Sequence, residues 1–259
     1  MFNQRAISIS EVRFLARQAL ILALCFFFSH VASAAIALDR TRIILNGDDK
    51  TVSLSIANEN KELPYLAQGW IENANGAKID SPLVVLPPVQ RVEPTSKSQL
   101  KIQALPAVAT LPQDRESVFY FNLREIPPKS KKSNVLQIAL QTKIKLFYRP
   151  ASLYVTKTDL THPWQEQILL ERGHQQIRVI NPTPYYVTIV NASKSENGAT
   201  IPGFKSFMIA PKESATLRDP ANALGATPVL TYINDYGGRP KLQFRCQGNR
   251  CAVDKALAS

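Results

Sequence analysis

The chain has 259 residues, and its 31 Lys and Arg against 20 Asp and Glu give a formal net charge of +11 at pH 7. Residues 1–34 have the pattern of a secretory signal, in which arginines precede the apolar run Ala19–Phe28 and the small-residue motif Ala32–Ala34 follows. Such a short apolar run cannot span a bilayer, which excludes a membrane-spanning helix here. We therefore expect cleavage after Ala34 and an exported, soluble protein.

The chain that remains is still basic, because the signal takes away only three basic residues and Glu11. Nucleic acid is a common partner of basic proteins, but export argues against it. The charge then fits an anionic surface or a carboxylate ligand, or it serves solubility alone.

Short strand patterns separated by turn residues follow the expected signal. Asn46-Gly47 is typical of a hairpin turn. Proline lacks the N–H that a central strand needs, so the proline-rich stretch Ser81–Pro94 should lie at a sheet edge or where a strand changes sheets. This density of short strands predicts one immunoglobulin-like sandwich. Its expected strands include Ala35–Leu45, Lys50–Ala57, Pro64–Ile71, Lys97–Ala104 and Ser117–Ile126.

The longest strand pattern covers residues 134–148 and follows the lysine- and proline-rich loop Pro127–Ser133. Leu136, Ile138 and Leu140 share one parity, so a strand would project them to one face. Typical strands have five or six residues, so this one should overhang its sheet, and an overhanging apolar edge needs a partner. A long core strand of a sandwich would show the same pattern, and the residues alone leave that alternative open.

Three cations occupy unusual positions within the strand patterns. Arg42 lies in the first expected strand, and Lys143 and Lys145 have the opposite parity to the apolar residues of the long strand. A lysine inside a strand commonly protects an edge from unwanted pairing. If Arg42 and Lys145 converge, however, they would form a pocket suited to a carboxylate.

A second group of strand patterns begins soon after Pro150 and predicts a second sandwich. We expect a first domain over residues 35–152 and a second over residues 153–259. The crevice between two linked sandwiches is a common place for a binding site. The expected strands are Leu153–Val155, Gln167–Leu170, Gln176–Ile180, Tyr185–Val190, Phe204–Ile209, Ser214–Leu217, Val229–Ile233, Lys241–Arg245 and Ala252–Val253, with 157–164 as the connection.

The sequence offers little chemistry for catalysis or metal binding. It contains no Gly-x-Ser-x-Gly, no His-Glu-x-x-His and no phosphate-binding glycine loop, so we expect no enzyme and no cofactor. Cys25 leaves with the signal, whereas Cys246 and Cys251 bracket four residues at the end of a strand pattern. In an oxidising compartment this spacing favours a disulfide across a terminal hairpin. A zinc site would need His162 and His174, which are distant in sequence.

Longer runs of specific residues extend over nearly the whole chain after Ala34. They are LDRTR from Leu38, PYLAQ and WIEN from Pro64, PPVQR from Pro87, LPQDRES and FYFNLREIPP from Leu111, NVLQIALQTKIKLFYRP from Asn134, NPTPYYVT from Asn181 and YINDYGGRP from Tyr232. In this order they resemble the periplasmic pilus-assembly chaperones of the chaperone–usher pathway. The resemblance implies an all-β protein with two immunoglobulin-like β-sandwich domains in a boomerang arrangement around a cleft.

The resemblance also implies a function and partners. A chaperone of this family works in the periplasm, where it binds, folds and caps pilus (fimbrial) subunits by donating a β-strand, here residues 134–148, and delivers them to an outer-membrane usher. Leu136, Ile138 and Leu140 match the residues that fill the groove of the subunit. Arg42 and Lys145 match the cations that anchor the C-terminal carboxylate of the subunit.

The same family carries an interdomain charged triad, which Glu116, Arg149 and Asp235 match. The family has no cofactor and no membrane insertion, and the free protein has the means to self-associate through its long strand. Lys145 has the opposite parity to the three apolar residues, so the two functions must use different faces or a bulge must intervene.

The alternative from another class is an exported structural adhesin or pilus subunit with immunoglobulin-like domains. A subunit should have one incomplete domain and an N-terminal extension of alternating apolar residues. This chain instead shows two complete sets of strand patterns.

Overall fold

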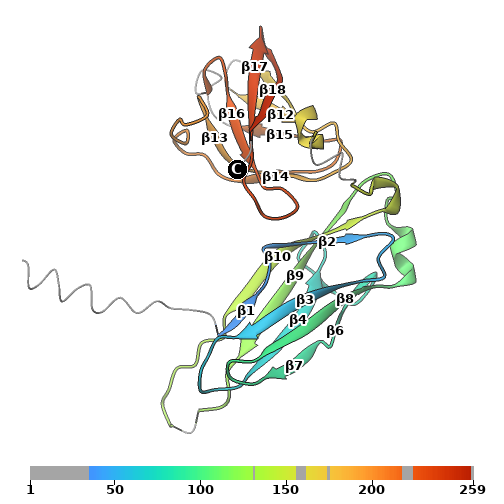
Figure 1. Ribbon diagram of the computed structural model, residues 1–259, viewed down its shortest axis with the longest axis vertical. Helices are drawn as coiled ribbons and strands as arrows, with labels where there is room; N and C mark the ends of the chain where they lie inside the picture. The colour runs from blue at the N-terminus through green and yellow to red at the C-terminus, as the bar shows by residue number, and fades with distance from the viewer. Residues whose placement is uncertain (1–34, 131, 156–161, 174–175, 218–223, 258–259) are drawn as a thin grey trace, which may run out of the picture. The chain divides into compact units, whose positions relative to one another are not determined.

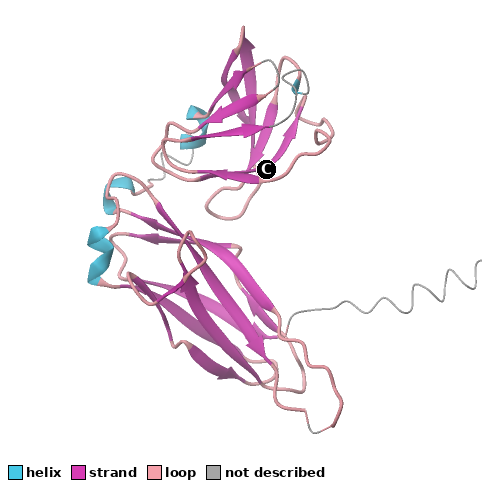
Figure 2. Ribbon diagram, turned by 180° about the vertical axis from the view of Figure 1, so that it is seen from behind, coloured by secondary structure: helices cyan, strands magenta, loops and turns pink. Residues whose placement is uncertain are grey.

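The computed structural model describes residues 35–130, 132–155, 162–173, 176–217 and 224–257. The expected signal 1–34, with Cys25, lies outside the described residues, as do His174 and most of the expected connection 157–164. Within the described ranges, strands joined by turns make up most of the chain (Figure 2). The only helices there are the short 3-10 helices η1 (Pro106–Thr110), η2 (Ala151–Leu153) and η3 (Trp164–Gln167). The expected all-β class is confirmed, and none of these helices is long and apolar enough to cross a membrane.

The first domain is a sandwich of two sheets (Figure 1). One sheet has the strand order β1-β3-β8-β6, and the other has the order β2-β10-β9-β4-β5, with β7 also paired to β4. The strands are β1 (Ile36–Leu38), β2 (Arg42–Asn46), β3 (Thr51–Asn58), β4 (Tyr65–Glu72), β5 (Lys78–Ile79), β6 (Leu83–Leu86), β7 (Val89–Val92), β8 (Lys97–Ala104), β9 (Ser117–Ile126) and β10 (Gln141–Arg149).

Two expectations about how stretches of the chain join the two sheets have different outcomes. The proline-rich stretch does lie at a sheet edge and does change sheets, since β6 ends one sheet and β7 belongs to the other. The single strand expected over Ala35–Leu45 is wrong, because β1 pairs with β3 whereas β2 pairs with β10 in the opposite sheet. Alternation of apolar and polar residues cannot show which sheet each half of a stretch will join.

The core of the first domain forms from alternate residues of the strands in both sheets. Phe119, Phe121 and Leu123 of β9 lie inside with Leu146 and Tyr148 of β10. Each large apolar side chain contributes about 1.5–3 kcal/mol when it is fully buried. This core fixes which residues of β10 face inward, and therefore which residues face outward.

The second domain is one eight-stranded sheet with the order β14-β13-β16-β17-β18-β11-β12-β15. Ile209 of β14 and Leu217 of β15 belong to the same core, so the two ends of this sheet close around one interior. The strand expected over Leu153–Val155 is wrong, because the N–H of Leu153 donates to Pro150 and η2 forms there. The strands are β11 (Leu169–Arg172), β12 (Ile177–Ile180), β13 (Val187–Ser193), β14 (Phe207–Ile209), β15 (Ser214–Leu217), β16 (Val229–Tyr232), β17 (Lys241–Gln247) and β18 (Arg250–Leu257).

The long strand expected over residues 134–148 is shorter in the structure, where β10 covers only Gln141–Arg149. Gln141 pairs with Arg124 near the end of β9, and the last bond in this direction runs from the N–H of Glu125 to the carbonyl of Leu140. No strand in the described part of the chain pairs with residues 134–139, so these residues have no backbone ladder to join. We call residues 134–140 the donor segment.

Candidate functional site

Arg42 and Lys145 lie side by side in the second sheet of the first domain. β2 and β10 run parallel, and Lys145 is the direct partner of Arg42 in their register. Both side chains are half-buried, and the guanidinium of Arg42 lies 5.9 Å from the centre of the Phe147 ring. Two cations from strands about a hundred residues apart therefore meet on one face of one sheet.

Neither Arg42 nor Lys145 forms an ion pair with any residue that the structure describes. Burial lowers the pKa of Arg42, against the opposing effect of Asp235 and Glu116, and burial and then Arg42 lower the pKa of Lys145. Arg42 Nη1 donates to the carbonyl of Ile233 at 3.0 Å, while its buried Nε has no hydrogen-bond partner among the described residues. Within the same part of the chain, Lys145 has no ion-pair partner. This arrangement is suited to receiving an anion.

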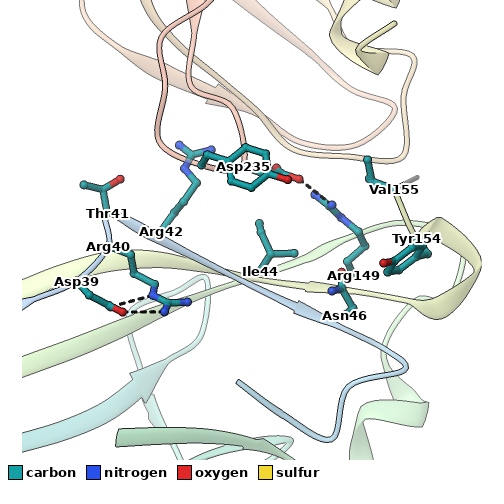
Figure 3. Close-up of a pocket in the computed structure, with 11 residues that line it drawn as sticks. Asp39, Arg40, Thr41, Arg42, Ile44, Asn46, Arg149, Tyr154, Val155 and Asp235 are labelled. Carbon is teal, nitrogen blue, oxygen red and sulfur yellow. Dashed lines mark hydrogen bonds and ion pairs between the residues drawn. The ribbon is translucent and has the colours of Figure 1, made fainter. Parts of the chain in front are cut away.

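A pocket of about 710 Å³ opens beside Arg42 (Figure 3). Arg40 donates two bonds to Asp39 at its rim, so that pair is internally neutral. Residues of both domains line the pocket, namely Asp39, Arg40, Thr41, Arg42, Ile44, Asn46, Arg149, Tyr154, Val155, Asp235 and Tyr236. Lys145 is not among the lining residues, so an anion shared by the two cations would lie at the edge of this pocket.

Arg149, at the end of β10, bridges Glu116 of the first domain and Asp235 of the second. Its guanidinium lies 2.8 Å from Glu116 Oε1 and 2.8 Å from Asp235 Oδ2, the bond drawn in Figure 3. The backbone N–H of Tyr186 donates to Glu116 Oε2 at 2.8 Å, and the ring of Tyr185 lies 5.0 Å from the guanidinium. The structure therefore brings together the three residues of the expected triad.

The charges of the triad are strongly perturbed by their surroundings. The side chains of Arg149 and Glu116 are 4% and 2% exposed. Burial raises the pKa of Glu116 to about 7, against the opposing effects of Arg149 and the Tyr186 N–H. Burial also opposes the charge of Arg149, but Glu116 and Asp235 outweigh it and raise the pKa of the guanidinium. For Glu116 the desolvation therefore outweighs the attraction of its partners, whereas for Arg149 the two acidic partners outweigh the desolvation.

The donor segment exposes its apolar side chains. Leu136 is 86% exposed, Ile138 is 66% exposed and Leu140 is 47% exposed. The amide of Gln137 donates to the carbonyl of Pro128 at 2.7 Å, so the segment lies against the preceding loop. A row of exposed apolar side chains with unpaired backbone is the usual mark of a surface that awaits a partner.

The register of β10 shows whether a bulge separates Lys145 from the apolar residues of opposite parity. Pairing with β9 is continuous from Gln141 to Tyr148, so no bulge lies between the donor segment and Lys145. Ile144 and Leu146 pack in the core, whereas Lys143 faces outward and pairs with Glu72 at 2.5 Å. Ile144 and Lys145 therefore face opposite sides of β10, and an extended continuation of this strand would carry Leu136, Ile138 and Leu140 on the side away from Lys145.

Two features near the site had no counterpart in the sequence reasoning. Phe147 packs on Tyr186 with ring centres 5.6 Å apart, which joins β10 to the second domain beside Arg42. The run NPTPYYVT contains Tyr186, so a sequence signal existed, but its contact could not be read from it. The acceptor for Arg42 is the backbone carbonyl of Ile233, and a backbone group leaves no signal in the sequence.

Cys246 and Cys251 are bonded across the hairpin of β17 and β18, which confirms the expected disulfide. Across the described ranges, no group of three or more His, Cys, Asp or Glu is arranged to hold a metal ion.

Two family models match the chain. The model for the PapD N-terminal domain of pili and flagellar-assembly chaperones matches residues 35–154, and the model for the C-terminal domain of the pili assembly chaperone PapD matches residues 163–244.

Individual proteins show the same relationship. The chain is 51% identical over 240 residues to chaperone protein PapD of Escherichia coli, covering 92% of this chain and 98% of PapD. It is 51% identical over 224 residues to the probable fimbrial chaperone YfcS of E. coli strain K12, covering 86% and 88% of the two chains. The crystal structure of the periplasmic chaperone SfaE matches with a TM-score of 0.63 and 31% identity over 80% of this chain and 98% of that one. These relatives are named as chaperones, not as enzymes, and the chain belongs to the PapD family of pilus-assembly chaperones.

Proposed function

We propose that this chaperone captures pilus subunits in the periplasm by lending them the donor segment and by anchoring their C-terminal carboxylate at Arg42 and Lys145. The observation that carries the proposal is the donor segment itself, whose Leu136, Ile138 and Leu140 are exposed and whose backbone before Leu140 has no ladder partner among the described residues. An adhesin or subunit is not favoured, because the relatives are chaperones.

Addition of a strand to a subunit explains what the exposed apolar side chains of the donor segment would do. A subunit that lacks its last strand has an open groove with unpaired backbone and an exposed core. The donor segment can supply both missing backbone bonds and apolar side chains, and the register of the pairing decides which side chains enter the groove. The subunit then stays folded until another strand replaces the chaperone, as would happen at an outer-membrane usher.

The anchor would set that register. A carboxylate at the edge of the pocket can accept bonds from Arg42 and Lys145, which relieves their mutual repulsion. Leu140 and Leu136 lie five and nine residues before Lys145, which corresponds to roughly 17 and 30 Å along an extended chain. Groove positions at these distances from the terminus of the subunit would then face the apolar residues.

The remaining parts of the chain would support this site. We propose that residues 1–34 direct export and are removed, and that the domains cover residues 35–152 and 153–259. The triad of Glu116, Arg149 and Asp235 would hold the second domain against the end of β10, on which Lys145 also lies. The anchor and the domain junction would therefore share one strand.

Subunit capture by purified chaperones tests the proposal. Co-expression of a pilus subunit with a Leu136→Ser/Ile138→Ser variant should yield no stable complex, while the parent retains it. The free energy of unfolding of the variant should match that of the parent, because both side chains are exposed. Substitutions at exposed positions usually change this free energy by no more than about 0.5 kcal/mol. Leu63→Ser is the matched control, since Leu63 is 45% exposed but lies outside the donor segment. Full capture by the double variant would refute strand donation.

A further inference from the structure

One buried carboxyl group in the first domain has no part in the site described above. Alternate residues of β9 face the core, and Phe119, Phe121 and Leu123 are buried apolar side chains in this series. Glu125 continues the series and is only 6% exposed. In the described part of the chain no lysine or arginine forms an ion pair with it. A buried carboxylate without a cation is costly, so a cation placed beside Glu125 would stabilise it.

The backbone of β1 lies directly on this carboxyl group. The N–H of Ile36 donates to Glu125 Oε2 at 2.8 Å in a buried bond. Ala35, which precedes it, is 8% exposed, and its carbonyl accepts the N–H of Glu59 at 2.7 Å. Successive backbone nitrogens of an extended chain are about 3.5 Å apart. The nitrogen of Ala35 therefore lies within roughly 6 Å of the carboxyl group of Glu125.

We infer that Glu125 is a binding site for the chain's own amino terminus, formed when the signal is cleaved after Ala34. The inference rests on the export that is part of the proposed function. In that hydrolysis, water adds a hydroxyl to the carbonyl of Ala34 and a hydrogen to the nitrogen of Ala35. The new α-amine takes up a further proton at neutral pH. A charge created at so buried a position requires a counter-charge, and Glu125 supplies it.

This contact would complete the subunit-binding surface. The N–H of Glu125 donates to the carbonyl of Leu140, the last residue of the donor segment. Figure 1 shows β1 at the same end of the first domain as the loop between β9 and β10. The ion pair would hold β1 of one sheet to β9 of the other where the donor segment leaves the domain. A precursor that keeps its signal has no charge at Ala35, so the contact forms only after export.

Four purified proteins test the inference. Two begin at Ala35 and carry either Glu125 or Glu125→Gln, and two carry an additional Gly-Ser in front of Ala35. Glutamine keeps an acceptor for the N–H of Ile36 while removing the charge. In urea unfolding at pH 7, the extension should lower the ratio of folded to unfolded protein at least about tenfold with glutamate, because it moves the charged amine away from a carboxylate that lies within roughly 6 Å of it. With glutamine the extension should change the ratio less than about twofold.

Glu59→Gln provides the matched control, since Glu59 is exposed and bonded to Ala35 through its backbone. That variant should keep the full effect of the extension. Equal effects of the extension on the glutamate and glutamine proteins would overturn the inference and leave the chaperone function untouched. Intact-mass analysis of exported protein should show Ala35 as the first residue, and any other first residue would also overturn it. Subunit capture, measured on the same proteins, reports separately on the proposed function.

Discussion

Replacing Arg149 with leucine should leave the buried carboxyl group of Glu116 at the domain junction without its cation. The side chains of Arg149 and Glu116 are 4% and 2% exposed, so in the variant Glu116 would keep only the backbone N–H of Tyr186 as a partner. Removing one member of a buried ion pair typically costs about 3–5 kcal/mol, because the other charge remains buried. Burial raises the pKa of Glu116 to about 7 even beside Arg149, so its carboxyl group can take up a proton in the variant. We therefore expect a loss at the lower end of this range in the free energy of unfolding.

Urea unfolding at pH 7 would measure this loss, and two further variants would assign it. Asp235→Asn should cost only about 1 kcal/mol, because the side chain of Asp235 is 25% exposed and asparagine keeps an acceptor for Arg149. A Glu116→Gln/Arg149→Leu double variant should recover part of the loss, since it removes the buried ionisable group that has lost its partner. A loss below about 1 kcal/mol for Arg149→Leu, or an equal loss for Asp235→Asn, would refute this reasoning.

Three other predictions concern the donor segment and the titrating groups. Backbone amides of residues 135–139 should exchange hydrogen rapidly in the free protein and slowly in a subunit complex, and slow exchange in the free protein would show that something already covers them. The affinity for a peptide with a free C-terminal carboxylate should fall at alkaline pH, because burial and Arg42 lower the pKa of Lys145 in the unliganded protein. A bound carboxylate would keep Lys145 protonated, so loss of that proton weakens binding. An affinity that stays constant with pH would contradict this. Burial raises the pKa of Glu116 from 4.5 to about 7, so the folded chain binds more protons in that window. The stability of the parent relative to Glu116→Gln should therefore increase as the pH falls from about 7 to 4.5, and the opposite slope would disprove it.

The strands themselves could be predicted from alternation and turn residues. The expected strands Lys50–Ala57 and Ser117–Ile126 correspond closely to β3 and β9. Pairing could not be predicted in the same way, because alternation describes one strand and not its neighbours. That is why Ala35–Leu45 divides between two sheets and why residues 134–140 have a strand pattern without a strand.

For the candidate site, too, the sequence could predict the residues but not the contacts that they make. Arg42 and Lys145 could be selected from the sequence because they match the pattern of a known family. Their contact depends on a parallel register between β2 and β10 that the sequence does not display. Glu125 shares the parity of the apolar core residues of β9, but a glutamate in a strand pattern is ordinarily taken for a surface residue, and only its burial beside Ile36 reveals its position.

The contact between Lys145 and a subunit carboxylate can be tested by calorimetry on four combinations. These are the parent and a Lys145→Ala variant, each with a subunit peptide that ends in a free carboxylate or in an amide. Charge-assisted hydrogen bonds contribute about 1.5–3 kcal/mol, so either single change should weaken binding by roughly ten- to a hundredfold. When both changes are combined, we expect little further loss beyond either one alone. Additive losses would show that the lysine and the carboxylate do not interact, and would contradict anchoring at Lys145.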